Sequence, residues 1–193
     1  MIHLLNSLAC RLDDFLDVSP WKRVELDLGC GSGGFSIKLA EHNPETLVLA
    51  ADVMLSRLRK VEKLKNRAGL KNLELLRVEA RHLTGRILPD AVLDRIHILC
   101  PDPWPKHKHK GNRLMSSEFM MSLRRILKPE GVLHFATDDP RYMNAALGNV
   151  AESGLFEQLP DSALADVSSF RTEFETDWLS IGRTVPHTAF RPV

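Results

Sequence analysis

Apolar runs and amphipathic stretches alternate along most of the chain. Short apolar runs bounded by turn residues predict strands over 23–28, 46–51, 73–78, 93–100 and 132–137. Apolar residues that recur every three or four positions predict helices over 33–42, 54–68, 115–127 and 140–152. This alternation predicts an α/β fold, with a mostly parallel sheet and helices on both of its faces.

The two ends of the chain carry weaker patterns. Near the start, leucines at helical spacing predict a leading helix; they are Leu4, Leu5, Leu8, Leu12 and Leu16. Residues 128–131 have the composition of a type I turn, and Asp139-Pro140 suits the start of the last long helix. Beyond Gly154 we expect short antiparallel strands near 155–159 and 178–185. Because no linker or repeat interrupts the pattern, we expect one domain over 1–193.

Composition indicates the cellular compartment and the class of partner. The net charge of the 193 residues is only +1, but 57–67 and 106–113 are basic and 152–177 is mostly acidic. This asymmetry is compatible with a polyanionic partner on one face. The three cysteines lack CxxC spacing and indicate neither disulfides nor zinc, and no signal sequence or membrane-length apolar run is present. We therefore expect a cytoplasmic protein that binds neither a membrane nor a metal.

A glycine-rich loop follows the first predicted strand, with the sequence Asp27-Leu28-Gly29-Cys30-Gly31-Ser32-Gly33-Gly34. Glycines let the backbone turn sharply and approach a ligand where a Cβ would collide, so Gly29, Gly31 and Gly33 are candidate cofactor contacts. The loop also contains the dinucleotide pattern GxGxxG and does not by itself distinguish between cofactors. A tight strand–helix turn without a ligand is the alternative.

Acidic residues at strand ends narrow the choice of cofactor. Asp52 ends the second long strand, where a carboxylate accepts hydrogen bonds from the ribose of NAD or of an adenosyl cofactor. Asp27 stands where the dinucleotide pattern usually has an apolar residue, and it favours a cationic head group such as that of S-adenosylmethionine. Glu79 follows the next strand and either accepts from an adenine amino group or begins a helix.

The most distinctive motif is Pro101-Asp102-Pro103-Trp104-Pro105-Lys106, which follows the strand predicted over 93–100. Three prolines in five residues exclude a helix interior or a central strand. The motif therefore predicts a rigid loop at a strand's carboxyl end, where open α/β sheets bind ligands. Trp104 either stacks on a base or anchors the loop in the core.

Cations extend this motif. We expect these cations to contact RNA phosphates, and a solvated loop is the alternative. The cations are Lys106, Lys108, Lys110 and Arg113. His107 and His109 alternate with lysines, which repel a metal ion, so no metal site is expected there.

Together these motifs make the chain similar to the bacterial tRNA (guanine-N7-)-methyltransferases over about 25–182. The most specific matches are 101–106, the pair Thr137-Asp138 after a strand, and Thr172-Glu173-Phe174-Glu175. The resemblance implies a class I methyltransferase (Rossmann-like) sheet with an antiparallel strand near the carboxyl end. It further implies S-adenosylmethionine as cofactor and a guanosine in the variable loop of tRNA as methyl acceptor.

The resemblance also implies roles for single residues, with Asp102 as the active-site carboxylate. The implied cofactor contacts are Asp27, Asp52, Glu79 and Asp102. The implied substrate contacts are Lys106, Asp138, Thr172, Glu173, Phe174 and Glu175. Without the resemblance, 172–175 would be interpreted as a surface loop.

The implied chemistry needs little from the protein beyond alignment. Guanine N7 carries an in-plane lone pair, and a sulfonium methyl is already activated, so catalysis is by proximity and orientation. We hypothesise that Asp102 accepts hydrogen bonds from guanine N1–H and the exocyclic amine and offsets the charge that develops on the ring. Two other classes stay open: an NAD-dependent oxidoreductase and a non-catalytic RNA-binding module. The sequence does not indicate an oligomeric state.

Overall fold

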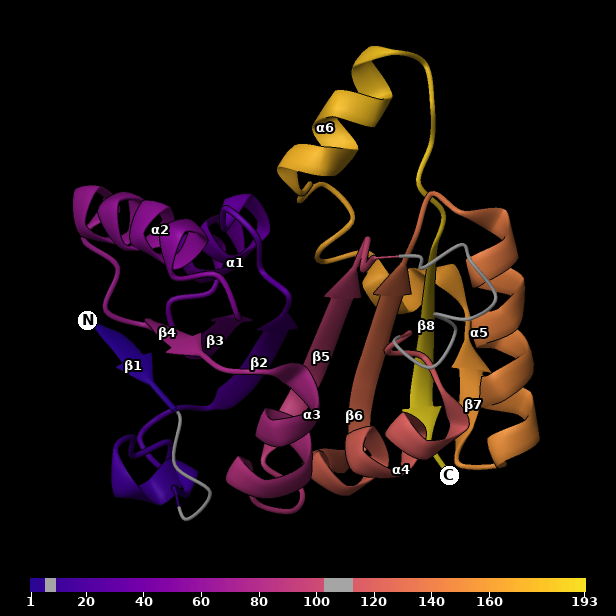
Figure 1. The fold of residues 1–193 in the computed structure, drawn as a ribbon, viewed down its shortest axis with the longest axis horizontal. Helices are drawn as coiled ribbons and strands as arrows, with labels where there is room; N and C mark the ends of the chain where they lie inside the picture. Colours follow the sequence, from indigo (N-terminus) through magenta and orange to yellow (C-terminus); the bar gives the residue numbers. More distant parts are fainter. Residues whose placement is uncertain (6–9, 103–112) are drawn as a thin grey trace.

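The structure, a computed structural model, describes residues 1–5, 10–102 and 113–193. Within these residues, eight strands form one sheet in the order β1-β4-β3-β2-β5-β6-β8-β7 (Figure 1). The strands are β1 (Ile2–Leu4), β2 (Arg23–Leu28), β3 (Thr46–Asp52), β4 (Leu73–Arg77), β5 (Leu93–Leu99), β6 (Leu127–Ala136), β7 (Phe156–Leu159) and β8 (His187–Pro192). The ladders from β1 through β6 are parallel, and β8 is antiparallel to both of its neighbours. The predicted α/β sheet with an antiparallel strand near the carboxyl end is confirmed.

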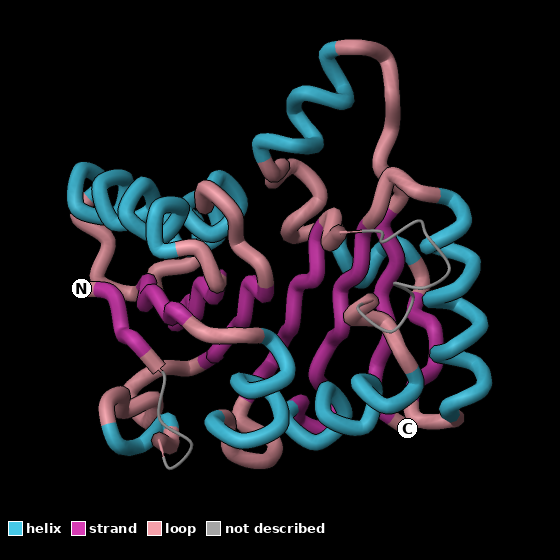
Figure 2. Tube along the Cα trace, in the orientation of Figure 1, coloured by secondary structure: helices cyan, strands magenta, loops and turns pink. Residues whose placement is uncertain are grey.

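Helices flank the sheet on both faces (Figure 2). They are α1 (Gly34–His42), α2 (Leu55–Ala68), α3 (Ala80–His82), α4 (Ser117–Ile126), α5 (Pro140–Ser153) and α6 (Glu173–Ser180), with shorter turns η1 (Leu12–Asp14), η2 (Leu83–Ile87) and η4 (Asp161–Leu164). One core lies between the sheet and η2, α4 and α5, and a second lies between the sheet, α1, α2 and 163–170. Apolar residues on both sides of the central strands explain their continuous hydrophobic runs.

The long central elements follow the sequence pattern closely. The strand expected over 23–28 is β2, and those expected over 46–51, 73–78 and 93–100 differ from β3, β4 and β5 by one residue at an end. Asp139 caps α5 as expected, because its side chain accepts from the backbone N–H of Arg141 (2.8 Å) and of Tyr142 (3.1 Å).

The expected leading helix is wrong. Ile2–Leu4 is an edge strand that pairs in parallel with β4, Leu12–Asp14 is a single 3-10 turn, and 6–9 lie outside the described residues. Burial explains only part of the leucine spacing: Leu5 and Leu12 are buried in the core, whereas Leu4 is 55 % exposed. A free sheet edge next to β4 therefore overrides a weak helical period.

The expected turn at 128–131 is also wrong, because these residues lie within β6. Leu93 pairs with Leu127 but Arg95 pairs with Val132, so the intervening residues of β6 bulge out of the ladder. The Lys128 ammonium anchors the bulge on the Asp94 carboxylate at 2.8 and 2.9 Å.

The strand expected over 178–185 is wrong: 178–180 are the end of α6, 181–186 form a turn and an irregular segment, and the strand antiparallel to β6 and β7 is β8. Thr172 and Glu175 form a capping box: the Thr172 hydroxyl accepts from the Glu175 N–H (3.1 Å), and Glu175 Oε2 accepts from the Thr172 N–H (2.9 Å). A threonine followed three residues later by glutamate is a helix-start signal, and it outweighs the weak apolar alternation that follows.

Among the described residues, no helix combines the length and apolar character needed to cross a membrane.

Candidate functional site

The parallel strands β2 to β6 all end at one edge of the sheet, and α6 lies beyond this edge (Figure 1). Every loop that was predicted to carry chemistry leaves a strand here: the glycine loop after β2, Asp52 at the end of β3, Glu79 after β4, Asp102 after β5 and Asp138 after β6. We call this edge the carboxyl edge. Ligands of open α/β sheets bind at such an edge.

The glycine loop is held by the strand beside it. The N–H groups of Gly29 (2.8 Å) and Cys30 (3.0 Å) donate to the Ala51 carbonyl of β3. Gly31 has a φ of +56°, in the left-handed region, and a Cβ built on it would meet no atom within 4 Å. Open space therefore lies against this part of the backbone, as a ligand cradle requires.

Asp52 shapes the same loop. Its side chain is 3 % exposed; Oδ2 accepts from the Gly31 N–H (3.1 Å), and Oδ1 accepts from the Met54 N–H (2.7 Å). The Arg57 guanidinium lies 3.4 Å from Oδ2. Since each carboxylate oxygen has two acceptor positions, Asp52 retains capacity for a further donor.

Asp27 is buried on the α1 side of β2. It accepts a short hydrogen bond from the Ser36 hydroxyl. Burial raises the pKa of Asp27 to about 6, and the Asp52 charge adds to this, although the Ser36 hydrogen bond and the His97 ring oppose it. A carboxylate in this state is stabilised by an added cation.

Glu79 caps the turn after β4. Its carboxylate accepts from the N–H groups of Arg81 (3.0 Å) and His82 (2.9 Å), so the helix-start interpretation of this residue is confirmed. Glu79 is also exposed at the carboxyl edge, which leaves its outer lone pairs accessible.

Asp102 is exposed and stands two residues after an unusual backbone position. Cys100 has a φ of +49°, which is rare for a residue with a Cβ, and its N–H donates to the Ala136 carbonyl of β6 (2.8 Å). Such strained positions concentrate at functional sites. The strain turns the chain out of β5 immediately before Asp102.

Asp138 and Glu175 lie close to this turn. Burial raises the pKa of the Cys100 thiol to about 12, and the negative charges of Glu175 and Asp138 contribute to the rise. Asp139, not Asp138, caps α5. Cys100 at the end of β5, Asp138 after β6 and Glu175 on α6 are therefore near one another at the carboxyl edge.

The segment Thr172–Glu175 divides into two parts. Glu175 is 1 % exposed and faces the sheet, whereas Glu173 and Phe174 are exposed on α6. Phe174 stacks edge-on against Trp178, with ring centroids 5.3 Å apart. The expectation from sequence alone that this segment is a surface loop is wrong, because its capping box begins a helix.

The remaining predicted residues come from the proline-rich motif and the cations that follow it. Trp104, Lys106, Lys108 and Lys110 lie outside the described residues. Arg113 is described, and its guanidinium lies 5.0 Å from the centroid of the Tyr142 ring, with a cation–π contact.

A row of side chains that was not predicted from the sequence crosses the sheet and is buried except for His187; we call it the imidazole array. Glu25 Oε2 lies 2.9 Å from His97 Nε2, His97 Nδ1 lies 2.9 Å from His134 Nδ1, His134 Nε2 lies 2.7 Å from His187 Nδ1, and His187 Nε2 lies 2.8 Å from Glu175 Oε1. The array starts on β2 and ends on α6. No local motif predicts it, although the opposed imidazoles of β5 and β6 follow directly from strand register.

A family described as "Putative methyltransferase" matches residues 22–188. The tRNA (guanine-N(7)-)-methyltransferase of Geobacter metallireducens is 38 % identical over 149 residues, which cover 74 % of this chain and 71 % of that protein. The one of Thermotoga maritima is 30 % identical over 163 residues, 83 % of this chain and 51 % of that protein. The chain thus spans about half the length of the Thermotoga relative.

Solved structures agree at the level of the fold. The 16S rRNA methyltransferase KamB superposes with a TM-score of 0.64 and 21 % identity, covering 91 % of this chain and 89 % of that one. This likeness supports the class I methyltransferase sheet. Because the family match spans most of the chain and the Geobacter relative is covered over more than two thirds of its length, the chain belongs to the tRNA (guanine-N(7)-)-methyltransferase family.

Proposed function

We propose that the protein transfers a methyl group from S-adenosylmethionine to N7 of a guanosine in the variable loop of tRNA. The observation that carries this proposal is that the glycine loop, Asp102 and Asp138 all follow parallel strands at one edge of the sheet, in a chain whose relatives are named for this reaction. We further propose that 1–193 acts as one domain in the cytoplasm, where tRNA is modified.

The cofactor fits the residues present. The glycine loop offers open space over Gly31, and Asp27 is a buried carboxylate that a cation would stabilise. S-adenosylmethionine, when bound, supplies a methyl group activated by a sulfonium. We assign Asp27 to the cationic end of the cofactor, Asp52 to its ribose and Glu79 to its adenine.

This assignment predicts that cofactor affinity depends on pH through Asp27. The pKa of Asp27 is raised to about 6, so below that pH the carboxyl is neutral and no longer attracts a cation. Affinity for S-adenosylmethionine should be about tenfold weaker at about pH 5 than at about pH 7.5, since one protonation then opposes binding. Calorimetric titration at the two pH values measures this.

The Asp27→Asn variant is the control for that experiment. Its affinity should be lower than that of the wild type at the higher pH and nearly independent of pH. A pH dependence that persists unchanged in this variant would assign the titration to another group.

The proposed chemistry asks the protein to align two groups and to exclude water. We assign Asp102 as the acceptor for the Watson–Crick edge of guanine, so that N7 on the other edge of the purine is directed at the methyl group. Asp138 and the Thr172–Glu175 segment lie on the neighbouring strand end and helix, and we assign them to the same base. No proton has to leave N7 before the methyl arrives, so no general base is assigned.

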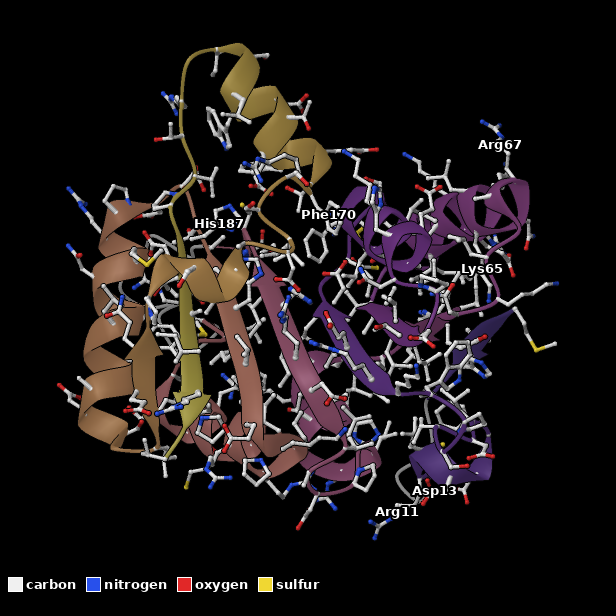
Figure 3. The ribbon with its side chains drawn as sticks, turned by 180° about the vertical axis from the view of Figure 1, so that it is seen from behind. Arg11, Asp13, Lys65, Arg67, Phe170 and His187 are labelled. Atoms are coloured by element: carbon white, nitrogen blue, oxygen red, sulfur yellow. The ribbon has the colours of Figure 1, made fainter. Side chains whose placement is uncertain are left out.

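Binding of tRNA requires cationic side chains that contact its phosphates, and α2 carries exposed cations in addition to those of the proline-rich loop. Arg59, Lys63 and Arg67 are exposed and four residues apart, so they form one stripe along the helix with a rise of about 6 Å between neighbours. Arg67 points away from the body of the protein in Figure 3. Such a stripe matches a negatively charged strand, and we assign it to the tRNA backbone together with Lys106, Lys108, Lys110 and Arg113.

Reversing the charge of this stripe should weaken tRNA binding. The Lys63→Glu variant is expected to raise the KM for tRNA roughly fivefold at about 0.1 M salt and to flatten its salt dependence, because one phosphate contact is lost. Steady-state methylation at several salt concentrations measures both. Arg86→Glu makes the same change of charge at an exposed site on η2 and should leave the KM unchanged. Equal effects of the two variants would show that net charge, and not contact with the stripe, determines the KM.

The proposed function is tested by incubating the protein with radiolabelled S-adenosylmethionine and unmodified tRNA and mapping the methylated base. Label at N7 of a variable-loop guanosine is the expected result. No incorporation, with tRNA still bound, would identify the non-catalytic RNA-binding alternative. The oxidoreductase alternative lacks support from the family and the relatives, and calorimetry with S-adenosylhomocysteine and NADH tests it directly: only the former should bind.

A further inference from the structure

The imidazole array has more contacts than neutral rings can satisfy. It contains two nitrogen–nitrogen contacts and two nitrogen–oxygen contacts, and each needs one proton between its atoms. Three neutral imidazoles carry three ring protons. A closed array therefore holds a fourth proton, because two facing lone pairs at 2.7 or 2.9 Å would repel each other.

The two carboxylates at the ends of the array are the acceptors. Burial opposes ionisation of Glu25, but the hydrogen bond and charge of His97, with Arg95 and Arg23, lower its pKa to about 2. The pKa of Glu175 is also lowered, since its hydrogen bonds to His187 and Thr172 outweigh its burial. Each end of the array is therefore a carboxylate that receives a ring N–H.

We assign the fourth proton to His97 and not to His187, because His97 faces two carboxylates: its ring contacts Glu25, and strand register pairs it with Asp27. Burial lowers the pKa of His134 well below its ordinary value, and so do the charges of His97, His187 and Arg95, so the central ring is neutral. With His97 protonated on both nitrogens, all hydrogen bonds close in one direction: His97 donates to Glu25 and to His134, His134 donates from Nε2 to His187, and His187 donates from Nε2 to Glu175. The tautomer of every ring is then determined.

Other charged and titratable groups face the array from the elements around it. Arg23 lies 2.8 Å from Glu25, Arg171 lies 3.9 Å from Glu175, and the rings of Phe35 and His97 have centroids 4.7 Å apart. The further groups are Asp27 and Arg95 beside His97, Cys100 beside Glu175, and Asp161, which lines a cavity of about 250 Å³ with His134, His187 and Arg171. The cationic ring at His97 thus lies between two carboxylates, Glu25 and Asp27.

Glu175 depends on this arrangement because it is buried. Its Oε2 accepts from the Thr172 N–H and its Oε1 accepts from His187, so the carboxylate is fixed by both oxygens. Figure 3 shows His187 below α6, near the segment that leads into this helix. Loss of the His187 donor would leave a buried carboxylate oxygen unsatisfied, and the start of α6 would have to move to restore a partner.

We propose that His187 is a positioning residue for Glu175, and that His134 acts through His187 by holding its ring in a single tautomer. This inference rests on the proposed function, in which the Thr172–Glu175 segment contacts the guanosine. The array then links Glu175 at the start of α6 to Glu25 on β2, three strands away in the sheet, and so holds the segment in position. It accounts for polar rings at positions where apolar residues would pack equally well.

The array itself is tested without any activity measurement. In the intact chain labelled with nitrogen-15 at histidine, one array ring should carry protons on both nitrogens, and His134 and His187 should each carry a single proton on Nε2. The resonances are assigned with His134→Phe and His187→Gln. Three singly protonated rings, or a mixture of tautomers at His187 in the wild type, would overturn the proposal.

The positioning role is tested with variants that keep the ring volume or the donor. His134→Phe preserves an aromatic ring but removes the donor, so the His187 ring should become a mixture of tautomers and the KM for tRNA should rise about tenfold, with kcat and affinity for S-adenosylhomocysteine within about threefold of wild type. His187→Gln retains an N–H for Glu175 and should keep most of the activity, whereas His187→Leu should lose it. His42→Phe is the matched control on the exposed end of α1 and should change nothing.

The outcomes separate this inference from the proposed function. If the wild type does not methylate tRNA, the proposed function fails, while the ring protonation pattern still decides whether the array exists. If the wild type methylates tRNA but His134→Phe leaves both the His187 tautomer and the KM unchanged, the positioning role fails alone. If His134→Phe does not fold, the wild-type spectrum still tests the protonation pattern of the array, and the comparison of His187→Gln with His187→Leu still tests the hydrogen bond to Glu175.

Discussion

Replacing Asp102 by alanine is expected to lower the rate of methyl transfer to tRNA about 1000-fold, which is the size of effect seen when a group that stabilises developing charge is removed. Asp102 is exposed at the carboxyl edge among the described residues, so we expect its replacement to cost the fold little stability. The thermal midpoint of unfolding should therefore be unchanged. Single-turnover methylation with saturating tRNA measures the chemical step.

The Asp102→Asn variant separates charge from hydrogen bonding. Asparagine keeps one acceptor oxygen and nearly the same shape but carries no charge, so a loss of about 100-fold is expected. An asparagine variant that turns over at the wild-type rate would remove the role of charge at this position. Asp13→Asn makes the same change on η1, which lies at the end of the molecule away from α6 in Figure 3, and should be silent.

Much of the fold was predictable because the central strands are buried on both faces. Leu26, Leu49 and Ile96 are all fully buried, and continuous apolar runs separated by regular amphipathic helices are typical of parallel strands in such a sheet. Predictions failed at the sheet margins, where neighbours decide the conformation. Ile2–Leu4 becomes a strand only because the edge of β4 is available.

Candidate residues of the site could be proposed from the sequence, but their geometry could not. Strand ends and the glycine loop indicated Asp27, Asp52 and Asp102, because parallel strands bring their carboxyl ends together whatever their order. The imidazole array depends on the order itself: His97 and His134 face each other only because β5 and β6 are adjacent and in register. Sequence separations of 37 and 53 residues between successive rings give no local signal for such contacts.

The glycine loop gives the second large effect, on stability. Gly33 has a φ of +83°, and a Cβ built on it would lie 2.6 Å from both methyl carbons of Val61 on α2. Gly33→Ala therefore combines a left-handed alanine with an overpacked contact, and the free energy of unfolding should fall by roughly 2–4 kcal/mol. Urea denaturation followed by circular dichroism measures this loss.

Two further variants assign the cause. Val61→Ala removes the clashing methyl groups, so Gly33→Ala should cost about 1–2 kcal/mol less in that background than in the wild type, and a purely additive cycle would contradict the contact. Gly31→Ala also places an alanine at positive φ but meets no atom within 4 Å, so it should cost only about 1–2 kcal/mol. Its methyl group would occupy the space assigned to the cofactor, and the affinity for S-adenosylmethionine should fall more than in Gly33→Ala at equal folded fraction. The two neighbouring glycines would then separate a requirement of the fold from a requirement of the ligand.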